Sequence, residues 1–153
     1  MEVTGAAERP SARGPAEWFT GEVWMDEIAS MPGPGPVRAL RVHFAPGART
    51  AWHVHPLGQI LHITEGVGRV QGETGPVRQV RPGDTVVVGA GERHWHGAAP
   101  DHLMCHLAIS GDRPHGTSTS PTRTTGRRPS PRDRGRRGRG FIFLDSYIAI
   151  EAY

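Results

Sequence analysis

The chain has 153 residues, of which 36% are hydrophobic, 21 are glycine and 14 are proline. This length allows one domain with a real core rather than two, and the wealth of turn residues favours many short strands over helices. A single cysteine, Cys105, excludes an intrachain disulfide, and no apolar run approaches the length of a membrane span. The first residues lack the basic-then-apolar order of a secretory signal, so we expect a soluble cytoplasmic protein without a membrane partner.

Positive charge is confined to one segment of the chain. Residues 1–110 carry a net charge of −2, residues 111–140 carry +7, and the last thirteen residues carry −2. The pI of about 10.0 therefore comes from that segment alone. We expect no nucleic-acid partner for the mildly acidic remainder.

Short β-favouring runs fill the middle of the chain. Residues 1–15 are expected to form a flexible N-terminal arm. Residues 16–110 follow as one domain, in which β-favouring runs alternate with turn signals such as PGPGP, HPLG, RPGD and GAGE. No sustained helical periodicity occurs there. About eight short strands at this spacing predict an all-β antiparallel sandwich or barrel.

Residues 111–153 differ in composition. Arg, Gly, Pro, Ser and Thr dominate as far as Gly140, after which FIFLDSYIAIEAY is rich in aromatic residues and isoleucine. We predict a low-complexity, Arg-rich, disordered tail, because its first part offers nothing that anchors a core. Three origins stay open, in order of preference: out-of-frame translation of GC-rich DNA, an inert tail, and an Arg/Gly-rich nucleic-acid arm. The lack of Lys and Asn indicates a GC-rich gene.

One constellation of histidines carries the functional signal. The pattern is Gly47-x5-His53-x-His55-x3-Gln59-x6-Gly66, followed by Gly83-x7-Gly91-x2-His94. Alternate side chains of a strand share a face, so His53 and His55 are expected to project together into the interior. Gln59 follows a short turn, and a distant strand pair brings in His94. Three imidazoles and one amide oxygen then form a site for a divalent metal ion, with open positions for a substrate.

These motifs resemble those of the cupin superfamily, G-x5-H-x-H-x3-E-x6-G and G-x5-P-x-G-x2-H. The resemblance implies a double-stranded β-helix, or jelly-roll barrel, of two antiparallel sheets. Two positions depart from the pattern: Gln59 replaces glutamate, and Gly89 replaces proline. An amide in place of a carboxylate leaves the full charge of the ion uncompensated. That favours polarising a hydroxyl, carbonyl or nitrile over activating O₂.

The segments GPAEWFTGEV, FAPGARTAWHVHPLGQ and GERHWHGAAP resemble a narrower group. These are the small bacterial cupins that include manganese-dependent (R)-selective hydroxynitrile lyases, and the resemblance runs from about Gly14 to about Ile109. It implies a metal bound by His53, His55, Gln59 and His94, with Mn favoured and Fe, Zn, Ni or Co open. It also implies cleavage of a cyanohydrin to a carbonyl compound and cyanide, in a homodimer or homotetramer.

Further site residues follow from strand parity and from the resemblance. Parity places His102, Met104, His106 and Ala108 on one face of the last core strand, and Leu103, Cys105, Leu107 and Ile109 on the other. The resemblance puts His106 near the metal as the catalytic general base. It puts Leu40, Val42 and Thr50 in the cavity wall. His96 shares a strand face with His94 and is a candidate donor beside the metal and substrate.

Other conspicuous residues are interpreted structurally. His43 and His62 are expected to face outward, and Phe44 is expected to pack in the core. Trp52 and Trp95 are expected to pack on the sheet, and Cys105 to be a small buried side chain facing away from the cavity.

Two other functions stay open. One is a non-catalytic cupin that binds a small molecule through the metal, and the other is a dioxygenase that uses Fe(II) and O₂. The three functions share one fold and one metal site, so the chemistry beside the metal has to separate them.

Overall fold

The computed structural model describes residues 1–111, 140–144 and 148–152. Its elements in chain order are η1 (Ala6–Glu8), β1 (Ser11–Arg13), β2 (Phe19–Thr20), β3 (Val23–Met31), β4 (Val37–Phe44), β5 (Arg49–Thr50), β6 (His53–Val54), β7 (Gln59–Gly66), β8 (Gly68–Gly72), β9 (Arg78–Val80), β10 (Thr85–Val88), β11 (His94–Ala98), β12 (Met104–Gly111), β13 (Gly140–Leu144) and β14 (Ile148–Ala152). Among the described residues, no helix is long and apolar enough to cross a membrane.

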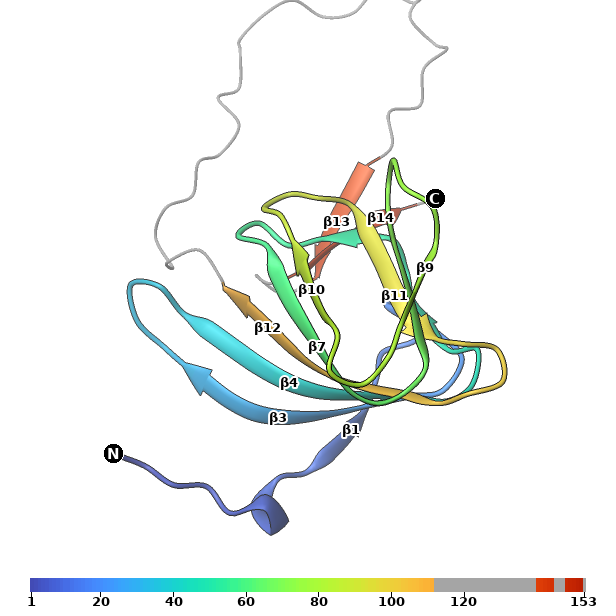
Figure 1. The fold of residues 1–153 in the computed structure, drawn as a ribbon. Helices are drawn as coiled ribbons and strands as arrows, with labels where there is room; N and C mark the ends of the chain where they lie inside the picture. The colour runs from blue at the N-terminus through green and yellow to red at the C-terminus, as the bar shows by residue number, and fades with distance from the viewer. Residues whose placement is uncertain (112–139, 145–147, 153) are drawn as a thin grey trace, which may run out of the picture.

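Two antiparallel sheets curve around a common interior (Figure 1), which confirms the all-β cupin barrel. The first sheet has the order β1-β3-β4-β12-β7-β10. The second has the order β13-β14-β6-β11-β5-β2, with β8 paired to β11 and β9 to β8. Several neighbours, such as β4 and β12 or β6 and β11, come from distant parts of the sequence, so strands that carry the motif residues are brought together only by the closed fold.

The first sheet turns alternate side chains inward. In β7, Leu61 and Ile63 are buried, while Ile60 and His62 face solvent. The inward residues join a core that includes Val23, Val42, Phe44, Met104 and Ala108. Period-two alternation of apolar and polar residues therefore sets which face of each strand meets the interior.

Two motif glycines sit where backbone conformation requires them. Gly58, in the turn between β6 and β7, has a φ of +86°, and a Cβ there would lie 2.6 Å from the carbonyl oxygen of Val88. Gly66, at the end of β7, has a φ of +74°, and a Cβ there would lie 1.9 Å from the carbonyl oxygen of Leu103. A side chain is therefore excluded at both positions by conformation and by space.

Part of the expected N-terminal arm belongs to the first sheet. Within residues 1–15, β1 pairs antiparallel with β3, and Ala12 lies opposite Met25. The amide of Gly14 donates to the carbonyl oxygen of Val23 at 2.9 Å, which extends the contact beyond the strand. The propensity of the segment gave no sign of this pairing, because an edge strand is fixed mainly by its partner.

The expected disorder of residues 111–153 is wrong for the parts that the structure describes. Gly111 ends β12, and β13 pairs antiparallel with β14. β14 in turn pairs with β6, where Ile150 lies opposite His53. This hairpin gives β6 a second neighbour besides β11, so β6 is not an edge of the sheet. Residues 112–139, 145–147 and 153, which carry most of the Arg-rich sequence, lie outside the described part.

Candidate metal centre

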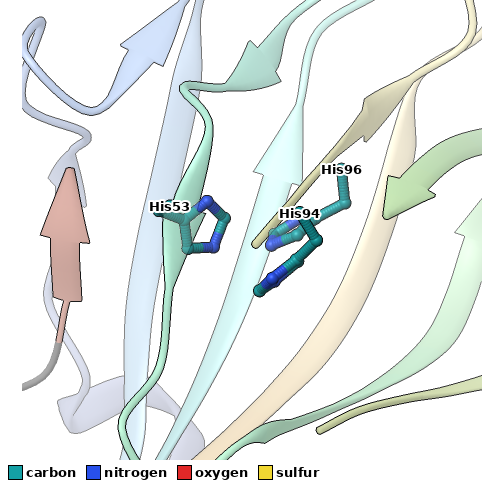
Figure 2. A group of neighbouring side chains, drawn as sticks. All are labelled: His53, His94 and His96. Atoms are coloured by element: carbon teal, nitrogen blue, oxygen red, sulfur yellow. The ribbon is translucent and has the colours of Figure 1, made fainter. Parts of the chain in front are cut away.

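His53 and His94 face each other from paired strands of the second sheet. They are register partners in the antiparallel pair of β6 and β11. Their ring centroids are 4.3 Å apart, and Figure 2 shows both rings turned toward the same space. The sequence motif thus predicted the inward direction of His53, and the β6–β11 pairing supplies the close approach of His94.

Backbone carbonyl groups fix the protonation of both rings. Nδ1 of His53 lies 2.9 Å from the carbonyl oxygen of Ala51, and Nδ1 of His94 lies 2.9 Å from that of Glu92. A carbonyl oxygen only accepts, so each Nδ1 carries the proton and donates it. The lone pair of each imidazole is therefore on Nε2, the atom left for a metal ion.

Gln59 and His55 complete the expected ligand set around this pair. Oε1 of Gln59 lies 3.1 Å from Nε2 of His94. His55 is buried, and its ring centroid lies 5.2 Å from that of His53 and 5.8 Å from that of His94. The structure thus brings together all four residues that the sequence predicted as ligands.

His96 belongs to the same cluster more closely than the sequence predicted. One ring nitrogen from each of His53, His94 and His96 lies within 4.8 Å of the others. The rings of His94 and His96 stack at 5.7 Å, as expected for alternate residues of one strand. Nε2 of His96 is buried and makes no hydrogen bond with any described residue. These three buried histidines can bind a metal ion.

Burial keeps the cluster uncharged. It lowers the pKa of His53 and of His96 well below the ordinary value, and neighbouring histidines lower both further. Burial also lowers the pKa of His94. A neutral imidazole is the form that binds metals, so the rings hold the right protonation state at neutral pH.

The arrangement of donor atoms fits a cation. His94 donates through Nδ1, so its Nε2 lone pair faces Oε1 of Gln59, and two electron-rich atoms meet at 3.1 Å. A cation bound between them would be attracted by both atoms. The donors are imidazole nitrogens and one amide oxygen, a set that suits several divalent first-row metals.

His106 adjoins this cluster from the first sheet. It is fully buried in β12, and its Nε2 lies 3.2 Å from Nδ1 of His96. Nδ1 of His106 is buried and makes no hydrogen bond with a described residue. Burial lowers the pKa of His106 to about 4, so the ring is neutral and able to accept a proton at neutral pH.

A cavity of about 280 Å³ opens beside the histidines. All five residues expected beside the substrate or as base contribute to its wall: Leu40, Val42, Thr50, His96 and His106. Thr50 also accepts a hydrogen bond from the backbone amide of His96 through its hydroxyl, at 3.1 Å. His53, His55 and Gln59 line the same cavity. His94 is not among the lining residues, but its Nε2 contacts Gln59, which is.

Other wall residues went unrecognised in the sequence. Trp18, Phe19 and Met25 supply apolar surface, and Arg38 and Ser110 supply polar groups. Met25, Arg38 and Ser110 alternate with outward residues on their strands, and this parity could have identified them as cavity residues. Trp18 and Phe19 carried no such signal, because their position depends on how the N-terminal segment closes over the barrel.

The turn before His94 replaces the rigidity of the missing proline with a hydrogen bond. The amide of Gly89 donates to the carboxylate of Glu92 at 2.8 Å, and the amide of Glu92 donates back to the carbonyl oxygen of Gly89 at 3.1 Å. Proline has no N–H and would lose the first bond. The departure from the motif is thus compensated within the turn.

The structural interpretations of the remaining residues are confirmed, apart from His102. His43 and His62 lie on the outer face, where they contact Asp26 and Thr85. His102 is exposed and precedes β12, which begins at Met104, so its predicted place on the cavity face is wrong.

The two tryptophans, Phe44 and the cysteine also lie as expected. The rings of Trp52 and Trp95 pack edge to face at 6.5 Å. Phe44 is a core residue, and its ring also contacts those of His96 and His106. Cys105 is buried with a free thiol, and burial raises its pKa.

Comparison with known proteins agrees with this fold and site. The family model "Cupin domain" matches residues 40–109. The chain is 51% identical over 109 residues to the (R)-mandelonitrile lyase of Granulicella tundricola, an alignment that covers 71% of this chain and 83% of that one. This chain therefore belongs to the cupin family.

Solved structures show the same fold. A cupin-like protein from Thermotoga maritima is 39% identical, with a TM-score of 0.58 over 65% of this chain and 75% of that one. The polyketide cyclase RemF from Streptomyces resistomycificus has a TM-score of 0.61 at 16% identity, over 72% of this chain and 79% of that one. At so low an identity the second likeness bears on the fold alone.

Proposed function

We propose that this chain is a metal-dependent lyase that cleaves small cyanohydrins to a carbonyl compound and hydrogen cyanide. The observation that carries the proposal is a neutral histidine cluster, with lone pairs directed inward, beside a cavity that also contains the uncharged base His106. The relative from Granulicella tundricola, named (R)-mandelonitrile lyase, supports the same reaction class.

We assign the metal to His53, His55, Gln59 and His94, with Mn(II) as the first choice of ion. A divalent ion held there would act as a Lewis acid toward the substrate oxygen. The ligands contribute no negative charge, which preserves the charge of the ion for that purpose. His96, whose ring stacks on that of His94, orients the cluster from its place in the cavity wall.

His106 serves as the general base in this proposal. It takes the proton of the cyanohydrin hydroxyl, the oxygen forms the carbonyl, and the bond to the nitrile carbon breaks with its electron pair. The leaving cyanide takes up the proton, so the base is restored and the atoms balance. The contact between His106 and His96 lets the two rings share the proton during the step.

The cavity wall selects the substrate in this proposal. Leu40, Val42 and Phe19 provide an apolar surface that suits an aryl or alkyl group. Thr50 holds the backbone of His96 through a buried hydrogen bond, which keeps that side of the wall rigid. A volume of about 280 Å³ accommodates a small aromatic compound and little more.

The test is a mandelonitrile cleavage assay combined with elemental analysis of the purified protein. We expect bound divalent metal, and benzaldehyde release that requires Mn(II) loading. His106→Gln is expected to lower kcat by about 10²- to 10⁴-fold with metal content retained, because a general base contributes on that order. His53→Ala is expected to lose both metal and activity.

The matched control is His62→Ala, which removes an exposed histidine from the outer face of β7. Its activity and metal content are expected to equal those of the unsubstituted protein. Bound metal without cleavage would leave a metal-dependent binding cupin as the function. Consumption of O₂ by an iron-loaded sample would support the dioxygenase instead.

A further inference from the structure

We propose that Phe44 is a positioning residue, whose ring holds the pair formed by His96 and His106 in place. The N-terminal segment braces this ring through Phe19 and Gly14. The catalytic meaning of the histidine pair rests on the proposed function above. The positioning itself rests on contacts between rings and on a close approach of the backbone, none of which involves a motif residue.

The histidine pair has few polar anchors. Nε2 of His106 and Nδ1 of His96 lie 3.2 Å apart in a buried contact. The other nitrogen of each ring, Nδ1 of His106 and Nε2 of His96, is buried and makes no hydrogen bond with a described residue. The torsion that turns a histidine ring has broad energy wells, so one shared hydrogen bond does not fix the orientation of either ring. Packing against neighbouring side chains has to do so.

Phe44 supplies this packing from the neighbouring strand. Its ring centroid lies 5.5 Å from that of His106 and 5.9 Å from that of His96. The register explains the contact, because Met104 of β12 lies opposite Phe44 of β4, and His106 follows two residues later on the same face. Diagonal neighbours of this kind are within reach of an aromatic side chain. The ring of Phe44, which is buried in the core, thus touches both histidines.

Phe19 of β2 packs against Phe44 in turn. The two rings meet edge to face, at a centroid distance of 6.0 Å and an interplanar angle of 67°. Gly14 lies against Phe19, because a Cβ at Gly14 would be 2.6 Å from Cδ2 and 2.7 Å from Cε2 of that ring. The amide of Gly14 donates to the carbonyl oxygen of Val23 at 2.9 Å, which holds the backbone there. The contacts thus run without interruption from Gly14 to the histidine pair.

Phe44 acts on the reaction through the histidines that it touches. It is not among the residues that line the cavity, whereas His96 and His106 are. A misplacement of a reacting group by about 1 Å lowers a rate by about 10²-fold, because proton transfer needs aligned partners. Loss of the Phe44 ring is therefore expected to affect catalysis without removing a contact with the substrate.

The first experiment observes the ring of His106 in metal-free protein with isotope-labelled histidines. NMR relaxation of the ring C–H groups gives an order parameter for each histidine, and the spectrum of His106→Gln assigns the signals. We expect about 0.85 for His106 in the unsubstituted protein, as for rigid groups, and less than about 0.6 in Phe44→Leu. An unchanged order parameter in Phe44→Leu would overturn the positioning role.

A pair of glycine substitutions tests the brace. Gly14→Ala places a methyl group against the ring of Phe19, and we expect it to loosen the contact with Phe44 and to lower the order parameter of the His106 ring. Gly35→Ala adds the same methyl group where nothing lies within 4 Å, and should leave the order parameter unchanged. Neither glycine has a positive φ, so neither substitution strains the backbone.

Gly14→Ala also keeps the proposal testable if Phe44→Leu does not fold, because it removes no atom from the core. An order parameter of His106 that stays the same in Gly14→Ala, or that falls equally in Gly35→Ala, would overturn the brace.

The second experiment measures mandelonitrile cleavage by the Mn(II)-loaded protein. Phe44→Leu should lower kcat by about 10- to 100-fold, with KM and bound metal unchanged. The control Val80→Ala truncates a core residue of β9 that does not line the cavity, and should keep kcat. An equal loss in Val80→Ala would mean that loosening of the core as such lowers the rate, and would overturn the role of Phe44.

The two experiments separate this inference from the proposed function. The order parameter requires neither metal nor substrate. A ring of His106 that loosens in Phe44→Leu, in a protein that cleaves no mandelonitrile, would sustain the positioning role and refute the lyase.

Discussion

His55 and His96 are alternative candidates for one ligand position in the proposed metal site. The motif selects His55, whereas the nitrogen spacing groups His96 with His53 and His94. We expect His55→Ala to weaken Mn(II) binding more than His96→Ala, whose loss should be on the order of tenfold, as for residues that orient ligands. Titration against a competing chelator measures both. A larger loss in His96→Ala would transfer the ligand role from His55 to His96.

His106 makes the stability of the metal-free protein depend on pH. Burial lowers its pKa from 6.5 to about 4, so the unfolded chain binds the proton more readily than the folded chain. The contribution of His106 to the free energy of unfolding is therefore complete above about pH 6.5. It is lost progressively as the pH drops toward 4. A shift of this size corresponds to roughly 3 kcal/mol. The lowered pKa values of His53, His94 and His96 act in the same direction.

Thermal unfolding of the metal-free protein at a series of pH values measures this effect. We expect Tm to decrease between about pH 7 and about pH 4.5. His106→Gln should show a flatter profile, because it removes one of the groups that titrate. A profile as steep as that of the unsubstituted protein would mean that His106 does not contribute.

Two adjacent residues of β7 allow the buried and exposed faces of the first sheet to be compared. Leu61 is fully buried, and its neighbour Ile60 is 41% exposed on the other face. Leu61→Ala is expected to lower the free energy of unfolding by about 2–5 kcal/mol, because it leaves a cavity in the core. Ile60→Ala, the same kind of truncation one residue away, should cost under about 1 kcal/mol. Urea unfolding of both variants measures the two losses in the free energy of unfolding. Equal losses would contradict the alternation of buried and exposed residues along β7.

The C-terminal hairpin gives a prediction for the whole molecule. β14 lies opposite Val54 and His53 of β6, in register through Ala149 and Ile150. Removal of residues 112–153 would make β6 an edge strand and expose its backbone groups to water. We expect a lower Tm and faster hydrogen exchange at the amides of β6 in the shortened chain. Exchange as slow as in the full chain would mean that the hairpin does not protect this strand.

Oligomeric state and cellular location concern the whole molecule as well, and both stay predictions. The resemblance to small bacterial cupins predicts a homodimer or homotetramer. Mass measurement by light scattering on the full chain tests this, and a monomeric mass would contradict it.

The sequence by itself determined the fold class and the expected ligand set. Turn signals between β-favouring runs predicted an antiparallel sandwich or barrel, because period-two alternation and Gly-Pro turns are local properties, and the resemblance to cupins implied the barrel. The spacing of His53, His55, Gln59 and His94 predicted their convergence, since the residue spacing of the two motifs encodes strand parity and turn length together.

Only the tertiary structure decided which further residues share the cavity. His96 joined the histidine cluster through the pairing of β6 with β11, and Arg38, Ser110 and Gln59 came to line one cavity through the position of β12 between β4 and β7. The N-terminal strand and the C-terminal hairpin were equally invisible in the sequence. Edge pairing and cross-strand rows depend on partners far along the chain, and local propensity carries no information about such partners.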